Sequence, residues 1–475
     1  MTARALARNE LRLQVRHAVI LTITVMTVLW SGLILVVDAA ARQDVMAWAL
    51  LLDVSALGFF FIPALAVVER EEGVTDALTM TGLSPFSYVT MRVGAMVAAS
   101  LLGGGVLVLV ATPDDPMTTM LGAGLLSLLF SLLAMTLVGT SPSMTAYFGR
   151  IPAVGVLLLL PALIDGSGLA DWPALALSPV TGGVRLLFGK FSWPAVTWLV
   201  VACAGLAIPA TIVALKVMPP AMSTRAGLKR PMRPVTSALI SFARVDWRTL
   251  RQDRILVLIG LGVPLLAAAL RLFQELGLDW LGERVGVDLV EYLPLLWAFV
   301  LVVHTPLMFG AMTGVLLLED RAARVTPAVA VTGASLRSLL TYRLGATAAA
   351  TLIGVFVGLW IVGAEGDAGW PGIILASVAA AAVSTVPAML IGVLARDRVQ
   401  GMAVMKTMSI PFYAPLAIWF GVPTWVLALI PTTWSAEAFW SESVSRASWM
   451  TLATILVSAI LVGLLARSYL RRVTM

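Results

Sequence analysis

The segment that decides the fold is residues 68–94, VEREEGVTDALTMTGLSPFSYVTMRVG, which recurs 251 positions later as residues 319–345, EDRAARVTPAVAVTGASLRSLLTYRLG. Aligned without a gap, 11 of the 26 positions from Glu69 to Gly94 are identical to their counterparts. An apolar run precedes each copy and another follows it. The chain therefore contains an internal duplication, in which the same polar corner joins the same two apolar segments.

The duplication extends to the start of each half. The stretch ARNELR at residues 7–12 matches ARVDWR at residues 243–248, and a proline-rich and basic stretch lies between the halves. We predict a first six-span repeat over residues 1–217, a cytoplasmic linker over 218–237 and a second six-span repeat over 238–475, both repeats having the same topology.

The composition indicates an all-α integral membrane protein. Of the 475 residues, 60% are hydrophobic and only 12% are charged, with a mean hydropathy of +0.96, whereas soluble domains are typically about 25% charged. A span needs about 20 apolar residues. Twelve spans are predicted, over residues 18–37, 45–68, 88–111, 117–139, 148–164, 194–215, 255–272, 293–318, 338–363, 371–394, 404–430 and 448–466. In a membrane protein, the net charge of +6 does not indicate nucleic acid.

The basic residues predict the orientation. If the N-terminus is cytoplasmic, only six of the 32 Lys and Arg residues fall on the outer side: Arg42, Arg185, Lys190, Arg271, Arg284 and Arg446. Lys and Arg concentrate in cytoplasmic loops. We therefore expect a multi-pass protein of the plasma membrane with both termini in the cytoplasm.

Each repeat opens with a basic helix. Arg4, Arg8, Arg12 and Arg16 recur every fourth residue and form one stripe. Such a helix can lie along the anionic inner leaflet, although ordinary flanking charge explains the arginines equally well.

The repeated corner has a predicted local structure. A short amphipathic helix from about residue 70 to 81 should end at Gly82, and Ser84-Pro85 should supply an N-cap followed by proline at the first helical position of the third span. The second copy keeps Gly333 and Ser335. The corner is either a plain connector or a docking site for a cytoplasmic protein.

The sequence lacks the motifs of nucleotide-binding and metal-binding sites. No Walker-type phosphate loop is present, and with only two histidines and one cysteine no metal cluster is expected. Ion-coupled transporters bury several ionisable residues, but Asp53 is the one acid found deep inside a predicted span. We therefore expect that the chain is not itself an enzyme and that a separate cytoplasmic subunit supplies the energy.

The corner motif Glu69-Arg70-Glu71-Glu72-Gly73, followed by Leu78 and by Thr81-Gly82-Leu83-Ser84, resembles that of the permease subunit of type-2 ABC exporters. The interfacial helix, the six spans and the proline-broken outer segment between the fifth and sixth spans are also similar. The fused form resembles a minority of actinobacterial drug and antibiotic export permeases.

This resemblance implies a bacterial membrane exporter of a hydrophobic or amphipathic compound. Two cytoplasmic ATP-binding subunits would hold ATP and Mg, and this chain would hold no cofactor. The residues expected to couple the spans to these subunits are Glu69, Arg70, Glu71, Glu72, Leu78 and Gly82 in the first corner, and Asp320, Arg321, Val329 and Gly333 in the second. The second corner has Ala322, Ala323 and Arg324 where the first has Glu71, Glu72 and Gly73.

Two other function classes remain open from the residues. One is a twelve-span secondary efflux transporter coupled to an ion gradient, which should show several carboxylates within its spans. The other is a membrane-embedded lipid-processing enzyme or scaffold, which should show polar catalytic groups clustered at one leaflet.

The candidates for the substrate path lie in the second span of each repeat. Trp48, Phe59, Trp297 and Phe299 are the aromatic candidates. Asp53 falls on His304 at the repeat offset of 251, and a charge at such depth normally finds a partner. Either Asp53 and His304 contact each other across the two repeats, or each bonds to a neighbouring helix.

Overall fold

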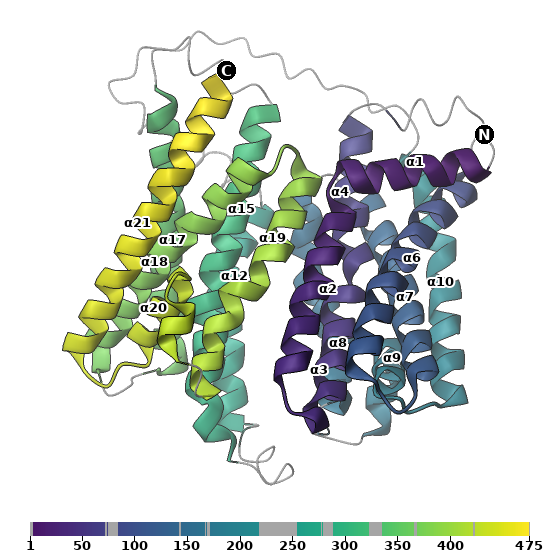
Figure 1. Ribbon diagram of the computed structural model, residues 1–475, viewed down its shortest axis with the longest axis horizontal. Coiled ribbons are helices and arrows are strands. Elements are labelled where there is room, and N and C mark those ends of the chain that lie inside the picture. The colour runs from purple at the N-terminus through teal and green to yellow at the C-terminus, as the bar shows by residue number, and fades with distance from the viewer. Residues whose placement is uncertain are drawn as a thin grey trace. The chain divides into compact units, whose positions relative to one another are not determined.

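The computed structural model of the protein describes residues 3–71, 74, 84–141, 144–166, 168, 172–217, 254–276, 278, 288–322, 335–364, 368–420 and 423–474. In these residues all regular structure is helical. The chain divides into two compact units, Met1–Gly227 and Leu228–Met475, and the boundary falls within the stretch predicted as a linker. Figure 1 gives the helix labels used below.

The first unit is a bundle of apolar helices. Its elements are α1 (Ala3–Arg16), α2 (Val19–Val36), η1 (Ala39–Ala41), α3 (Arg42–Ala49), η2 (Leu50–Val54), α4 (Leu57–Glu71), α6 (Pro85–Ala111), α7 (Pro116–Gly139), α8 (Met144–Gly166), η3 (Pro173–Leu177), α9 (Pro179–Leu187) and α10 (Trp193–Val217). Helix α7 packs against α4, α6, α9 and α10. Small residues such as Gly122 and Ala123 let these helices approach closely.

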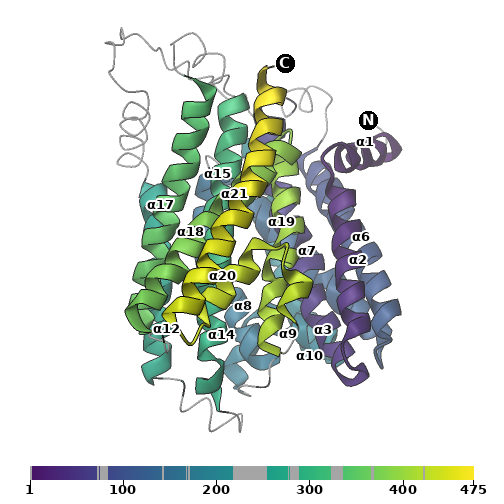
Figure 2. The ribbon, with the colours of Figure 1, turned by 60° about the vertical axis from the view of Figure 1, so that its left-hand side comes forward.

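The second unit is also a bundle of apolar helices. Its elements are α12 (Arg254–Leu276), η4 (Leu289–Tyr292), α14 (Leu293–Trp297), η5 (Ala298–His304), α15 (Thr305–Ala322), α17 (Leu336–Val362), α18 (Gly369–Leu394), α19 (Arg398–Tyr413), η6 (Ala414–Phe420), η7 (Thr424–Leu427), α20 (Pro431–Phe439) and α21 (Val444–Thr474). Helix α18, rich in alanine, packs against α15, α17 and α21, and Figure 2 shows it beside α21. Gly310 and Gly314 lie against α18, where a Cβ atom on either would meet Ser384, Pro387 or Ile391.

Nine of the twelve predicted spans are confirmed, within the described part of the chain, as helices long and apolar enough to cross a membrane. The other three predicted spans correspond to α8, α12 and α19, which are helical but are not among those nine. The complete count of twelve therefore stays a prediction.

Three local features recur in both units. Ser84 and Ser335 cap α6 and α17, accepting hydrogen bonds from the backbone N–H groups of Ser87 (3.1 Å) and Ser338 (3.0 Å), which confirms the predicted N-caps. Short helices that begin at a proline, α9 and α20, follow 3-10 helices in the proline-broken segments between the predicted fifth and sixth spans of each unit. The third shared feature is a π-helix within the predicted second span, η2 in the first unit and η5 in the second.

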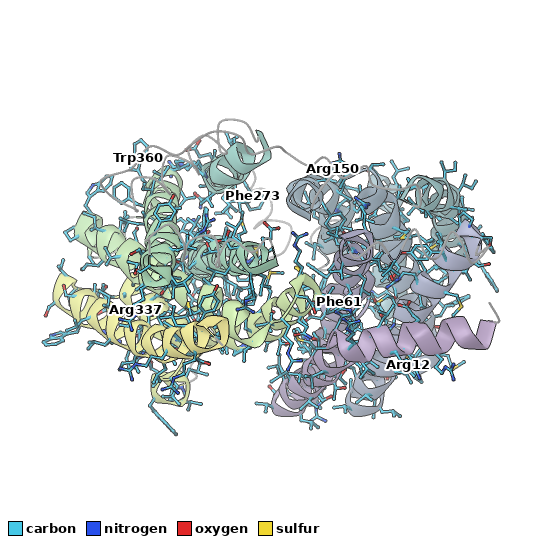
Figure 3. The ribbon with its side chains drawn as sticks, turned by 90° about the horizontal axis from the view of Figure 1, so that it is seen from above. Arg12, Phe61, Arg150, Phe273, Arg337 and Trp360 are labelled. Carbon is cyan, nitrogen blue, oxygen red and sulfur yellow. The ribbon has the colours of Figure 1, made fainter. Side chains whose placement is uncertain are left out.

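Helix α1 lies across one end of the first unit, whereas α2 and α6 run along it (Figures 1 and 2). Figure 3, turned to look onto that end, shows α1 lengthwise and labels Arg12 on it. Arg8, Arg12 and Arg16 are exposed, and so are Leu11 and Val15. A helix with exposed arginines beside exposed apolar side chains has the composition of one lying at a membrane surface.

Candidate functional site

A buried ionic cluster joins three helices of the first unit where α4 ends and α6 begins; we call Glu10, Glu69, Tyr88 and Arg92 the corner cluster. Glu69 accepts a hydrogen bond from the Tyr88 hydroxyl at 2.7 Å and another from the Arg92 guanidinium. Arg92 also lies 3.4 Å from Oε1 of Glu10 on α1. All four side chains are buried. The cluster therefore fixes the corner to both α1 and α6.

The local sequence explains this geometry. Tyr88 and Arg92 are four residues apart and so project from one face of α6, while Glu69 stands near the C-terminal end of α4. The guanidinium keeps its charge under all ordinary conditions, and a buried charge must be paired. Two carboxylates face this one guanidinium. Burial raises the pKa of Glu10, and the nearby positive charge of Arg92 opposes that rise only in part.

The second unit carries a looser version of the same contact. Asp320 and Arg343, the counterparts of Glu69 and Arg92, form a two-pronged ion pair with both N···O distances at 3.2 Å. Their side chains are 14% and 17% exposed, against 5% and 3% for Glu69 and Arg92. Leu339 replaces the hydroxyl-bearing Tyr88. The two corners are therefore built alike but held with different strength.

Arg321, predicted to couple the second corner to a partner, is engaged within its own unit. Its guanidinium donates to the carbonyl oxygens of Gly392 at 2.9 Å and Ala395 at 3.3 Å, and it lies 5.2 Å from the centre of the Tyr469 ring. A cation at these carbonyls stabilises the C-terminal end of α18. Its counterpart Arg70 is half-buried in α4.

The remaining predicted coupling residues are mostly outside the described part of the chain. Glu71 is the last residue of α4. Glu72, Leu78, Gly82, Val329 and Gly333 lie outside the described residues, and so does most of each predicted coupling helix. Their role in docking a partner stays a prediction.

Asp53 and His304 each have a hydrogen-bond partner within their own unit. Asp53, in the π-helix η2, accepts a hydrogen bond from the indole N–H of Trp30 on α2 at 2.5 Å. His304, the last residue of the π-helix η5, bonds through Nδ1 to the hydroxyl of Tyr413 on α19 at 2.5 Å. Separate bonding to neighbouring helices was one of the two alternatives drawn from the sequence. The predicted contact between Asp53 and His304 stays a prediction.

The aromatic candidates differ in how accessible they are. Phe59 is buried, with its ring centre 5.9 Å from that of Tyr147. Trp48 is half-buried and meets the ring of Phe188 edge-on at 5.6 Å. Within their units, these two side chains act as packing residues.

The counterparts in the second unit are more open. Phe299 is 40% exposed and lies 5.3 Å from the ring of Tyr413, and Trp297 packs at the edge of an apolar core formed by α12, α17 and α18. Phe299 and His304 on the π-helix η5 thus form an aromatic group with Tyr413 on α19, and π-helices are often found at functional sites.

The sequence reasoning missed several residues of these sites. Trp30 and Tyr413 gave no signal, because an aromatic residue in an apolar run looks like any packing residue. Arg92 and Arg343 did give one, since they are identical in the two copies and each lies within a predicted span. An arginine there calls for an acidic partner, and Glu69 and Asp320 fill that role.

Comparison with known proteins places the chain among transport proteins. The family model described as Fluoroquinolones export permease protein Rv2686c-like matches residues 246–466. The Fluoroquinolones export permease protein Rv2686c of Mycobacterium tuberculosis (strain ATCC 25618 / H37Rv) is 28% identical over 226 residues, which cover 46% of this chain and 90% of the relative.

A second protein of the same organism, the Fluoroquinolones export permease protein Rv2687c, is 30% identical over 213 residues, which cover 42% of this chain and 89% of the relative. Since less than half of this chain matches nearly all of each relative, each relative has about half the length of this chain. The chain is a multi-pass membrane protein and belongs to the Rv2686c-like family of export permeases.

Proposed function

We propose that the chain is the complete membrane domain of an ATP-driven ABC exporter, with two ATP-binding subunits docked at its two cytoplasmic corners. The observation that carries this proposal is that the chain forms two compact units, while its permease relatives have about half its length. One chain would then hold both halves of a transport path. Nucleotide-driven closure of the partner subunits would move the spans of each unit as rigid bodies, a common form of alternating access.

The corner cluster supports the proposed coupling. A force applied between α4 and α6 reaches both helices together, because Glu69 and Arg92 join them through buried, charge-assisted hydrogen bonds. In the second unit, Asp320 and Arg343 join α15 to α17 in the same way. Each corner can therefore transmit motion to two spans at once.

The proposed substrates are small hydrophobic or amphipathic drugs, exported from the cytoplasm of a bacterium. Fluoroquinolones are the first class to test, because the names of the two relatives specify them. The exposed Phe299, beside Tyr413 and His304, offers aromatic surface for a flat drug molecule.

The test is reconstitution of the full chain in vesicles, with and without the ATP-binding subunits that co-purify with it. We expect drug transport to require those subunits and ATP, and the isolated chain to hydrolyse no ATP. Transport that runs on an ion gradient without ATP would instead support the secondary-transporter alternative.

Leu78→Pro separates docking from assembly. Proline within a helix costs about 3 kcal/mol or more, so we expect the variant to reach the membrane but to uncouple ATP hydrolysis from transport. The matched change in the second corner is Val329→Pro. Undiminished transport by both variants would contradict the proposed role of the corners. Glu69 is a poor choice for this test, because its replacement also breaks the buried corner cluster.

A further inference from the structure

A long groove lies on the first unit between α1, α2 and α6. It has a volume of about 650 Å³ and is lined on α6 from Thr90 to Val106. The sixteen steps from Thr90 to Val106, with a rise of 1.5 Å each, make it about 24 Å long. Its floor is formed by the small residues Gly94, Ala95, Ala98 and Ala99. The half-thickness of a bilayer's hydrocarbon core is about 15 Å, so one acyl chain of a single leaflet fits along the groove.

One end of the groove is polar, and two buried polar atoms there lack a well-formed hydrogen bond. Glu10 and Gln14, one turn apart on α1, both line it and are only 7% and 4% exposed. Oε1 of Glu10 lies 3.4 Å from the Arg92 guanidinium and the Gln14 side chain interacts with Glu10, but neither Oε1 of Glu10 nor Nε2 of Gln14 makes a hydrogen bond of good geometry. Buried polar atoms of native proteins are normally paired. A ligand that brings a donor for Glu10 and an acceptor for Gln14 would satisfy both atoms.

The charge at this end is also unbalanced. Arg92 is shared between Glu69 and Glu10, and the distance to Glu69 is the shorter of the two. One guanidinium faces two carboxylates, so a net negative charge remains next to the groove whenever both carboxylates are ionised. Burial raises the pKa of Glu10 and Arg92 lowers it, and a bound ammonium group would further favour the ionised form of Glu10.

We propose that this groove binds a phospholipid with an ammonium headgroup, such as phosphatidylethanolamine, with one acyl chain along α6, the ammonium at Glu10 and a phosphate oxygen at Gln14. Apolar side chains with wide exposure, Val28, Leu102 and Val106, flank the groove and fit a chain lying in the bilayer. An anionic lipid without an ammonium group would leave Glu10 uncompensated. This proposal does not depend on the proposed export function.

The test measures which lipid the purified full-length chain retains. The protein in mild detergent is incubated with phosphatidylethanolamine or phosphatidylglycerol carrying identical acyl chains, and bound lipid is counted by native mass spectrometry. A charge-assisted hydrogen bond contributes about 1.5–3 kcal/mol, so we expect about tenfold or greater preference for phosphatidylethanolamine. Equal retention of both lipids would overturn the proposed headgroup site.

Three variants sharpen this test. Gly94→Phe should fill the groove and abolish the preferential retention, because a Cβ at Gly94 meets no atom within 4 Å. Gly345→Phe is the matched control, since Gly345 is the counterpart of Gly94 and is equally open; it should bind lipid as the wild type does. Glu10→Gln should keep lipid bound but lower the headgroup preference to near one.

A second blocking variant guards against a folding defect. Ala98→Phe places a ring at another exposed position of the same groove floor, and both blocking variants are compared with the wild type for melting temperature before lipid is counted. If well-folded Gly94→Phe and Ala98→Phe proteins retain as much phosphatidylethanolamine as Gly345→Phe, the groove is not the lipid site.

Discussion

Removal of the charge at Arg92 should lower the stability of the first unit much more than the matched change at Arg343 lowers the stability of the second unit. Arg92→Met leaves Glu69 and Glu10 buried without a cation. Breaking a buried ion pair from one side costs about 3–5 kcal/mol. In a unit of this size each kcal/mol lowers the melting temperature by roughly 2–4 °C, so the expected fall is on the order of 10 °C.

Arg343→Met is the control. Its pair with Asp320 is partly exposed, so water screens the charge that is left behind. We expect a loss of about 1 kcal/mol and a fall of roughly 2–4 °C. The tryptophan fluorescence of the purified protein, which has 15 tryptophans, reports the melting temperature.

A triple variant separates charge from packing. In Glu10→Gln, Glu69→Gln, Arg92→Met no uncompensated charge remains, and replacement of a whole ionic group by neutral residues of similar size is often tolerated. Most of the lost stability should return. Equal falls for Arg92→Met and Arg343→Met, or no recovery in the triple variant, would refute the electrostatic account of the corner cluster.

The other predictions concern packing, pH and the π-helices. Gly310→Ala should destabilise the second unit by about 1–3 kcal/mol, because a Cβ there would collide with the backbone oxygen of Ser384. The control is Gly345→Ala, which lies in open space and should be neutral. Equal melting temperatures of the two variants would contradict this packing. Because the pKa of Glu10 is raised by folding, its contribution to stability is present at low pH and is lost as the pH rises from the ordinary glutamate pKa through the folded value. Glu10→Gln should remove that part of the pH dependence, and identical stability curves for wild type and variant between pH 4 and about 8 would exclude it. A double-mutant cycle with Asp53→Asn and Trp30→Phe should give a coupling energy of about 0.5–3 kcal/mol in thermal stability, as should His304→Gln with Tyr413→Phe; purely additive effects would mean that the hydrogen bonds do not hold these side chains.

The spans and the helix caps could be predicted because their signals are local. A run of about 20 apolar residues marks a span wherever it occurs, and Ser84-Pro85 specifies a helix start through its own side chain and ring. The proline-broken outer segments were also visible, since each proline limits the helix around it.

Partners distant in sequence could not be predicted. Asp53 was recognised as an acid in need of a partner, but nothing in the sequence marks Trp30, 23 residues away on α2. The π-helices are set by the hydrogen-bond register of the whole span and have no residue signature. Glu69 is expected among the coupling residues because the sequence shows only its place in the corner motif, and nothing there indicates that its side chain bonds to Arg92.

The two π-helices occupy matching places, but one carries Asp53 and the other His304. In a transporter assembled from two copies of one short chain, every substitution is made twice, and an acid in one half always faces the same acid in the other. In the fused form proposed for this chain, that constraint ends. Each unit of this chain can acquire its own substitution. A natural variant or a laboratory mutant of this protein therefore changes one unit and leaves the other unchanged.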